Sequence, residues 1–83
     1  MSAYFVNLSG ANLMWANLEG VIMADANLRG ANLSDANLSD ANLCRTDLSG
    51  ANLSGANLSN AALLGASLFC ANLLGADLTD ARI

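Results

Sequence analysis

The sequence contains no proline, no histidine and no lysine, and aromatic residues make up only 5% of its 83 positions. Without histidine, the chain lacks the side chain that most often serves as a general base or a metal ligand. Three arginines against seven acidic residues give a formal net charge of −4. The chain therefore lacks the basic surface that direct nucleic-acid binding requires.

Cysteine and long hydrophobic runs are also scarce. Cys44 and Cys70 form no CxxC pair and have no histidine beside them, so we expect free thiols in a reducing compartment and a cytoplasmic location. The first residues have no basic start followed by an apolar core, and we expect no signal peptide. No run approaches the ~18 apolar residues of a transmembrane helix, so we expect no membrane span.

A five-residue repeat fills the chain instead. Every fifth residue from Leu8 to Ile83 is apolar, and fourteen of these sixteen residues are leucine. We call this position i. Position i−2 is usually alanine, position i−1 is usually Asn or Asp, and position i+2 holds all seven glycines. Because it has so regular a period, the chain is expected to be a repeat protein.

A period of five fits neither a helix nor a flat strand. On a helix the leucines would step around every side, and on a strand they would alternate between faces. Positions i−2 and i share a face in a short extended piece, so both point inward and i−1 points outward. Gly, Asn and Asp at i+2 tolerate the positive φ of a type II turn. If each turn bends the path by about 90°, four pentads close a square coil of twenty residues.

This geometry predicts an all-β solenoid of about four coils of 20 residues, in a single domain over residues 1–83. Residues twenty apart should stack. We expect the column of Asn12, Asn32, Asn52 and Asn72 to form a hydrogen-bonded asparagine ladder.

The unit Ala31-Asn32-Leu33-Ser34-Asp35 and its copies resemble the pentapeptide repeat proteins, over essentially the whole chain. The resemblance implies a right-handed quadrilateral β-helix. Members of that family often carry a capping helix or a terminal dimer interface. No segment of helix length stands at either end of this sequence, so we expect no clear capping helix.

Large apolar residues occupy positions i+1 and i+2 only near the two ends, whereas serine dominates position i+1 in the middle. The candidate interaction residues are Tyr4, Phe5, Met14, Trp15, Leu64, Phe69 and Leu74. Exposed apolar patches usually mark contacts, so we expect a protein partner, or self-association through the coil ends as a homodimer or an end-to-end oligomer. Alternatively, these residues cover the open ends of the coil, or a further segment covers them.

No catalytic constellation accompanies the repeat. The serines have no histidine to activate them, and the aspartates at i+2 are explained by turns rather than by a metal site. We therefore predict no enzyme activity, no cofactor and no metal, and a structural or protein–protein interaction module.

The alternative function is DNA mimicry. Some pentapeptide repeat proteins imitate the DNA rod and bind a type II topoisomerase (gyrase), which gives quinolone resistance. Asp40 and Asp80 should share one side of the coil with Asp77 nearby, while Arg29 and Arg45 interrupt the negative field elsewhere. A spacer role within a larger protein is a third option.

Overall fold

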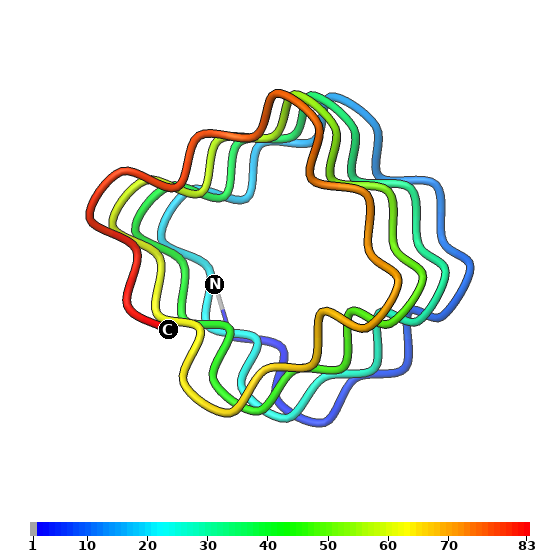
Figure 1. The fold of residues 1–83 in the computed structure, drawn as a ribbon. Coiled ribbons are helices and arrows are strands. Elements are labelled where there is room, and N and C mark those ends of the chain that lie inside the picture. The colour runs from blue at the N-terminus through cyan, green and yellow to red at the C-terminus, as the bar shows by residue number, and fades with distance from the viewer. Residues whose placement is uncertain (1) are drawn as a thin grey trace.

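The backbone winds into a four-sided coil. The computed structural model describes residues 2–83, and Figure 1 looks along the coil, so that successive turns overlie one another. Parallel β-bridges join residues that are twenty apart, from Ser2–Ile22 to Ala62–Arg82. The chain therefore forms coil 1 (2–20), coil 2 (21–40), coil 3 (41–60) and coil 4 (61–80), and residues 81–83 begin a further turn.

The coil has four sides, which we call walls, and each wall is defined by one column of bridged residues. Wall 1 contains Ser2, Ile22, Asn42, Ala62 and Arg82; wall 2 contains Asn7, Asn27, Asp47 and Ser67; wall 3 contains Asn12, Asn32, Asn52 and Asn72; wall 4 contains Asn17, Asn37, Asn57 and Asp77. All of these are i−1 positions. Each wall also presents the i+1 and i+2 residues that follow its bridged residues.

Backbone hydrogen bonds join each coil to both of its neighbours. The N–H of Asn32 donates to the Ala11 carbonyl of the preceding coil (2.9 Å), and the N–H of Leu33 donates to the Asn52 carbonyl of the following coil (2.7 Å). The N–H at i+2 also donates to the following coil. Three of the five amides of a regular pentad are thus satisfied between coils, as buried backbone groups require.

The other two amides are satisfied locally, at the turn between one pentad and the next. The N–H of Ala36 closes a turn on the Leu33 carbonyl (3.1 Å), and the N–H of Ser34 donates to Oδ1 of Asn32 (3.1 Å). Asp35, at i+2 of this turn, has φ +58°. The prediction of positive φ at i+2 is confirmed, because every such residue in the described chain has it.

The asparagine columns stack as expected, but their side-chain oxygens bond within one coil and not from coil to coil. Asn12, Asn32, Asn52 and Asn72 are bridged in register. Each side-chain Oδ1 nevertheless accepts from the N–H two residues later in its own pentad. The ladder expectation was therefore wrong about the bonding. The sharp turn leaves the i+1 amide without a backbone acceptor, and an Asx turn supplies one.

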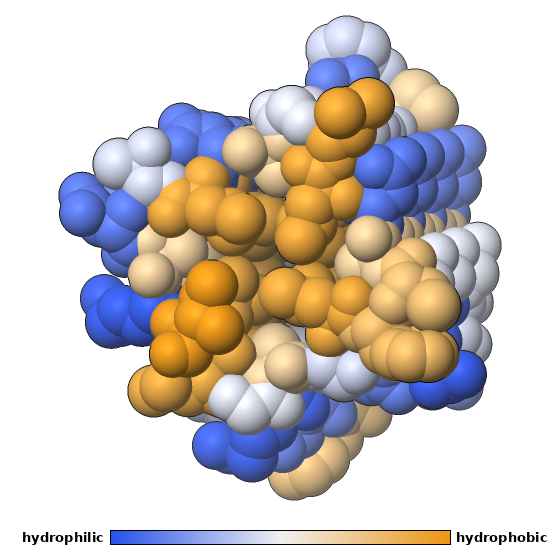
Figure 2. Space-filling view, in the orientation of Figure 1, coloured by the Kyte–Doolittle hydropathy of each residue, from blue (hydrophilic) through white to orange (hydrophobic). Residues whose placement is uncertain are grey.

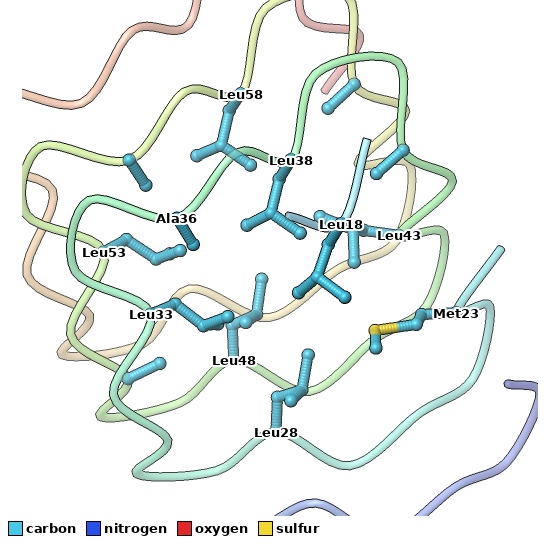
Figure 3. Packing of buried hydrophobic residues seen from close by; sticks show 14 of the residues in the cluster. Leu18, Met23, Leu28, Leu33, Ala36, Leu38, Leu43, Leu48, Leu53 and Leu58 are labelled. Atoms are coloured by element: carbon cyan, nitrogen blue, oxygen red, sulfur yellow. The ribbon is translucent and has the colours of Figure 1, made fainter. Parts of the chain in front are cut away.

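Leucine and alanine fill the interior. The i-position leucines from Leu28 to Leu63 are almost completely buried, and Figure 3 shows Leu18, Leu38 and Leu58 stacked one above another on one side of the core. At the ends, Leu8 and Leu13 and then Leu68, Leu73 and Leu78 are only half-buried. Figure 2 shows the resulting apolar centre of one end face, with polar groups at its rim.

The twenty-residue, four-sided path is confirmed. Among residues 2–83 the walls consist of isolated bridges, with no helix and no named strand. Each side is too short for a strand, because two of every five residues belong to a turn. The right-handed sense and the single domain over 1–83 stay predictions, and Met1 lies outside the described residues.

Candidate functional site

The candidate site is the outer surface of the coil. The inward positions are filled by packed leucine and alanine, and residues 2–83 present no pocket. Over the same residues no cluster of three metal-binding side chains occurs. No helix in this range is long and apolar enough to cross a bilayer.

All seven predicted interaction residues are exposed, but they fall on three different walls. Tyr4, Phe5 and Leu64 belong to wall 1, Phe69 belongs to wall 2, and Met14, Trp15 and Leu74 belong to wall 3. Within each wall they lie in coil 1 or coil 4, as the sequence indicated. Coils 2 and 3 separate the two groups, so the structure does not bring the seven together into one patch.

Wall 1 differs from the other walls because apolar residues continue through its middle. Its i+1 column runs Tyr4, Ala24, Cys44 and Leu64. Its i−1 column has Ile22 and Ala62 where the other walls mostly carry Asn or Asp. We call Tyr4, Ile22, Ala24, Cys44, Ala62 and Leu64 the apolar stripe. Reading the sequence in steps of five hid this stripe, whereas aligning it in steps of twenty reveals it.

The apolar stripe also lacks hydrogen bonds that the other walls have. Ile22 and Ala62 have no side-chain oxygen to offer, so within residues 2–83 no acceptor is recorded for the N–H of Ala24 or Leu64. In the neighbouring coil, Cys44 N–H donates to Oδ1 of Asn42 (3.1 Å). Two turns of wall 1 have therefore lost their Asx bond.

Wall 4 carries the net charge of the molecule. Glu19, Asp40, Asp77 and Asp80 lie on it, with no arginine. On the other three walls, three acids (Asp25, Asp35 and Asp47) are matched by three arginines (Arg29, Arg45 and Arg82). The formal charge of −4 thus sits on wall 4. The expectation that Asp40, Asp77 and Asp80 share one side is confirmed.

Two ion pairs neutralise acidic side chains on walls 1 and 2. On wall 1, Arg45 donates from Nε to Oδ1 of Asp25 (2.8 Å) and from a terminal nitrogen to Oδ2 (3.1 Å). This hydrogen bonding lowers the pKa of Asp25 and raises that of Arg45. On wall 2, Arg29 lies 3.2 Å from Asp47.

Hydroxyl groups lower the pKa of two further carboxylates. Ser49, through its side chain and then its backbone N–H, is the main cause of the lowered pKa of Asp47, ahead of Arg29. On wall 4, the Thr79 hydroxyl donates to Asp77 (2.6 Å) and lowers the pKa of that carboxyl in the same way. Both aspartates occupy the i−1 position, so they serve as Asx-turn acceptors and not as free acids.

Both thiols are free, as expected. Cys44 is half-buried in the apolar stripe, and Cys70 is exposed on wall 2.

The chain matches the family model described as "Pentapeptide repeats", in eight copies over residues 11–50 and 46–83. No curated protein matches it. Among solved structures it resembles alr5209, a pentapeptide repeat protein from Nostoc PCC 7120, with 48% identity and a TM-score of 0.89 over 90% of this chain and 62% of that one.

Two further structures are similar. A pentapeptide repeat protein from the cyanobacterium Cyanothece 51142 shares 36% identity, with a TM-score of 0.55 over 98% of this chain and 63% of that one. HetL from Nostoc sp. strain PCC 7120, described as involved in heterocyst differentiation regulation, shares 36% identity, with a TM-score of 0.50 over 98% of this chain and 44% of HetL. The chain thus spans less than two thirds of the length of each of these structures. Its repeats and these likenesses place the chain in the family of pentapeptide repeat proteins.

Proposed function

We propose that this protein is a non-enzymatic interaction module, a right-handed four-sided β-helix that binds a protein partner through the outward apolar side chains of its first and last coils. One observation carries the proposal. Seven large apolar side chains at positions i+1 and i+2 stand exposed on a coil whose core is already filled without them. Exposed apolar groups of this size are costly in water unless a contact covers them.

The backbone of the outermost coils supports self-association. In coil 4, the N–H groups of Leu73 and Gly75, which in other coils would donate to the following coil, have no acceptor within residues 2–83. In coil 1 of the same range, the carbonyls of Asn12 and Met14 have no donor from a preceding coil. In the described chain coil 1 likewise leaves the N–H of Asn12 free and coil 4 the carbonyl of Ala71, so each end offers both donors and acceptors, and another coil placed on either end would continue the same pattern. Unpaired edges of this kind are templates for pairing.

The test is the oligomeric state in solution. Tyr4, Met14, Leu64 and Leu74 all occupy position i+1, where serine is common in coils 2 and 3. The quadruple variant Tyr4→Ser, Met14→Ser, Leu64→Ser and Leu74→Ser should therefore keep the fold. We expect the wild-type chain to elute as an oligomer in size-exclusion chromatography with light scattering, and the variant as a monomer with the same circular dichroism. A wild-type monomer at every concentration would refute self-association.

DNA mimicry is a second candidate, and wall 4 is the observation that favours it. Its four carboxylates give one face of the coil a negative charge. The field is sparse beside that of a DNA duplex, which carries one charge per ~1.7 Å of axis, and the ion pairs of Asp25 and Asp47 remove charge from walls 1 and 2. A gyrase supercoiling assay tests this candidate, because a folded protein without effect at micromolar concentration would count against DNA mimicry.

Location and regulation are further parts of the proposal. The two free thiols fit a reducing compartment, and we propose the cytoplasm. HetL, which the chain resembles, is described as involved in heterocyst differentiation regulation, and we propose a regulatory role for this chain as well.

A further inference from the structure

We propose that wall 1 is the contact surface of a symmetric dimer, in which two copies of this chain lie side by side with their coils antiparallel. The proposal rests on the proposed function, since it names both the partner and the face. It differs from end-to-end association, because the contact runs along the full height of the coil.

The apolar stripe is the only surface of the described chain with a partly or fully exposed apolar side chain in every coil. Tyr4 and Leu64 are 54% and 56% exposed, and Ile22 and Cys44 are partly exposed between them, whereas Ala24 and Ala62 are buried. On wall 3, by contrast, Ser34 and Ser54 separate the apolar residues of coil 1 from those of coil 4. A continuous apolar surface favours a partner that lies along the wall.

The size of the wall matches a dimer contact. The described chain is nearly as tall as it is wide, with extents of 26 × 22 × 20 Å and an accessible surface of 4174 Å². One of its six faces therefore has roughly 700 Å², so two facing walls bury about 1,400 Å², within the range of stable specific interfaces.

Charge selects wall 1 over wall 4 as the place for a second copy. Two copies of wall 4 would face each other with four carboxylates on each side, and such like-charge contacts are unfavourable. On wall 1 the carboxylate of Asp25 is already paired with Arg45, 2.8 Å away. With Arg82 included, wall 1 has a formal charge of +1 against −4 for wall 4, so two copies of wall 1 repel far less.

The antiparallel arrangement follows from the order of residues along the wall. A two-fold axis that crosses wall 1 between coils 2 and 3 sets coil 1 against coil 4 of the second copy. Tyr4 then faces Leu64 at both ends of the contact. At its centre the partly exposed Cys44 comes level with the buried Ala24, and Ile22 comes level with Asn42. A parallel pair would instead set Tyr4 against Tyr4 and Leu64 against Leu64.

The same axis also matches the charges. Asp25 in coil 2 comes level with Arg45 of the second copy, on the same edge of the wall, and Arg45 comes level with Asp25. Gly65 leaves room for Arg45, since a Cβ at Gly65 would lie only 3.1 Å from Cγ of the arginine. Two ion pairs within the chains thus become one cluster of four alternating charges, which favours this pairing over others.

The first experiment compares two leucines at the same height. Leu64 and Leu74 are both exposed i+1 residues of coil 4, but Leu64 is on wall 1 and Leu74 is on wall 3. In sedimentation equilibrium of the full chain, we expect Leu64→Ser to raise the dimer Kd about a hundredfold, roughly tenfold for each of its two symmetric contacts. Leu74→Ser should leave Kd within about twofold.

The second experiment uses charge reversal. Positions 25 and 45 are both i+2 sites with positive φ, one holding Asp and the other Arg, so D25R and R45D introduce residue types that this position accepts. Neither variant should dimerise alone, because four like charges would meet. Mixed in equal amounts they should form a heterodimer at least about tenfold tighter than either homodimer.

The outcomes separate the wall 1 dimer from the proposed function as an interaction module. Equal weakening by Leu64→Ser and Leu74→Ser would assign the association to the coil ends, which would overturn the wall 1 dimer and keep the proposed function. A mixture of D25R and R45D that associates no better than its components would refute the antiparallel arrangement. A wild-type chain that stays monomeric would overturn the dimer altogether.

Discussion

Wall 1 and wall 4 are built on the same backbone and yet present opposite surfaces. Both have buried leucine inside, and both turn through a positive-φ residue in every coil. Wall 4 has Asn17, Asn37, Asn57 and Asp77 at its bridges, each accepting the amide of its own turn. Wall 1 replaces two such acceptors with Ile22 and Ala62.

The difference shows that the outward chemistry of this coil is not dictated by its fold. An Asx hydrogen bond contributes about 1 kcal/mol to the stability of the fold. The apolar residues Ile22 and Ala62 on wall 1 forgo this contribution. That loss is offset if the exposed apolar surface is covered by a partner. Wall 4 has all of its Asx bonds and remains a charged, solvated face.

The largest expected effect tests whether the two walls share one core. Leu43 lies behind wall 1 and Leu38 behind wall 4, and both are fully buried. We expect Leu43→Ala and Leu38→Ala each to lower the free energy of unfolding by about 2–5 kcal/mol, and by similar amounts. Urea unfolding followed by circular dichroism measures both. A difference of several kcal/mol between them would mean that the walls do not rest on an equivalent core.

A smaller effect should come from exchanging the bridge residues of the two walls. Asn57→Ala on wall 4 removes the acceptor for the Ser59 amide (3.0 Å) and should cost about 1 kcal/mol. Ala62→Asn on wall 1 supplies an acceptor for the Leu64 amide and should gain about 0.5–1 kcal/mol. Urea midpoints at a constant m-value give both changes. If Ala62→Asn is destabilising, the missing Asx bond is not what distinguishes wall 1.

The smallest effect concerns pH. The Thr79 hydroxyl and amide lower the pKa of Asp77 below its ordinary value of 3.8, and Arg45 does the same for Asp25. A carboxyl with a lowered folded-state pKa stabilises the fold above its unfolded pKa, and this contribution is lost as pH falls through the folded pKa. We therefore expect both walls to lose stability as the pH falls below about 4.

Asn at position 77 tests this, because an amide oxygen still accepts the turn hydrogen bonds but does not titrate. Between pH 5 and pH 2, the urea midpoint of Asp77→Asn should fall less than that of the wild-type chain. An equal fall in the two proteins would show that Asp77 contributes nothing to the acid sensitivity.

Much of the fold could be predicted from single residues of the repeat. Leu33 and its equivalents identify the inward face. Gly, Asn and Asp at the position of Asp35 mark most of the turns, because these residue types accept positive φ readily, whereas Phe5, Trp15, Arg45 and Cys70 adopt it without signalling it. The role of Asn32 was misjudged, because both a ladder and an Asx turn suit a stacked asparagine. Only the position of the Ser34 amide, 3.1 Å from Oδ1 of Asn32, distinguishes the Asx turn from the ladder.

The candidate site was predictable in part. The exposure of Tyr4 and Leu64 follows from their place at i+1, since the inward positions are taken by alanine and leucine. Ile22 and Cys44 were missed, because each looks like an isolated departure when the sequence is read in pentads. They become neighbours of Tyr4 and Leu64 only when residues twenty apart are stacked.

The sequence by itself determined the five-residue period, the filled interior and the four-sided path, because side-chain size and φ tolerance act within one pentad. Only the tertiary structure decided how the outward side chains bond, because Asn32 accepts the amide of its own turn and Arg45 pairs with Asp25 of the neighbouring coil. Contacts between coils join residues far apart along the chain, and these contacts gather an apolar stripe on one wall and all of the net charge on another.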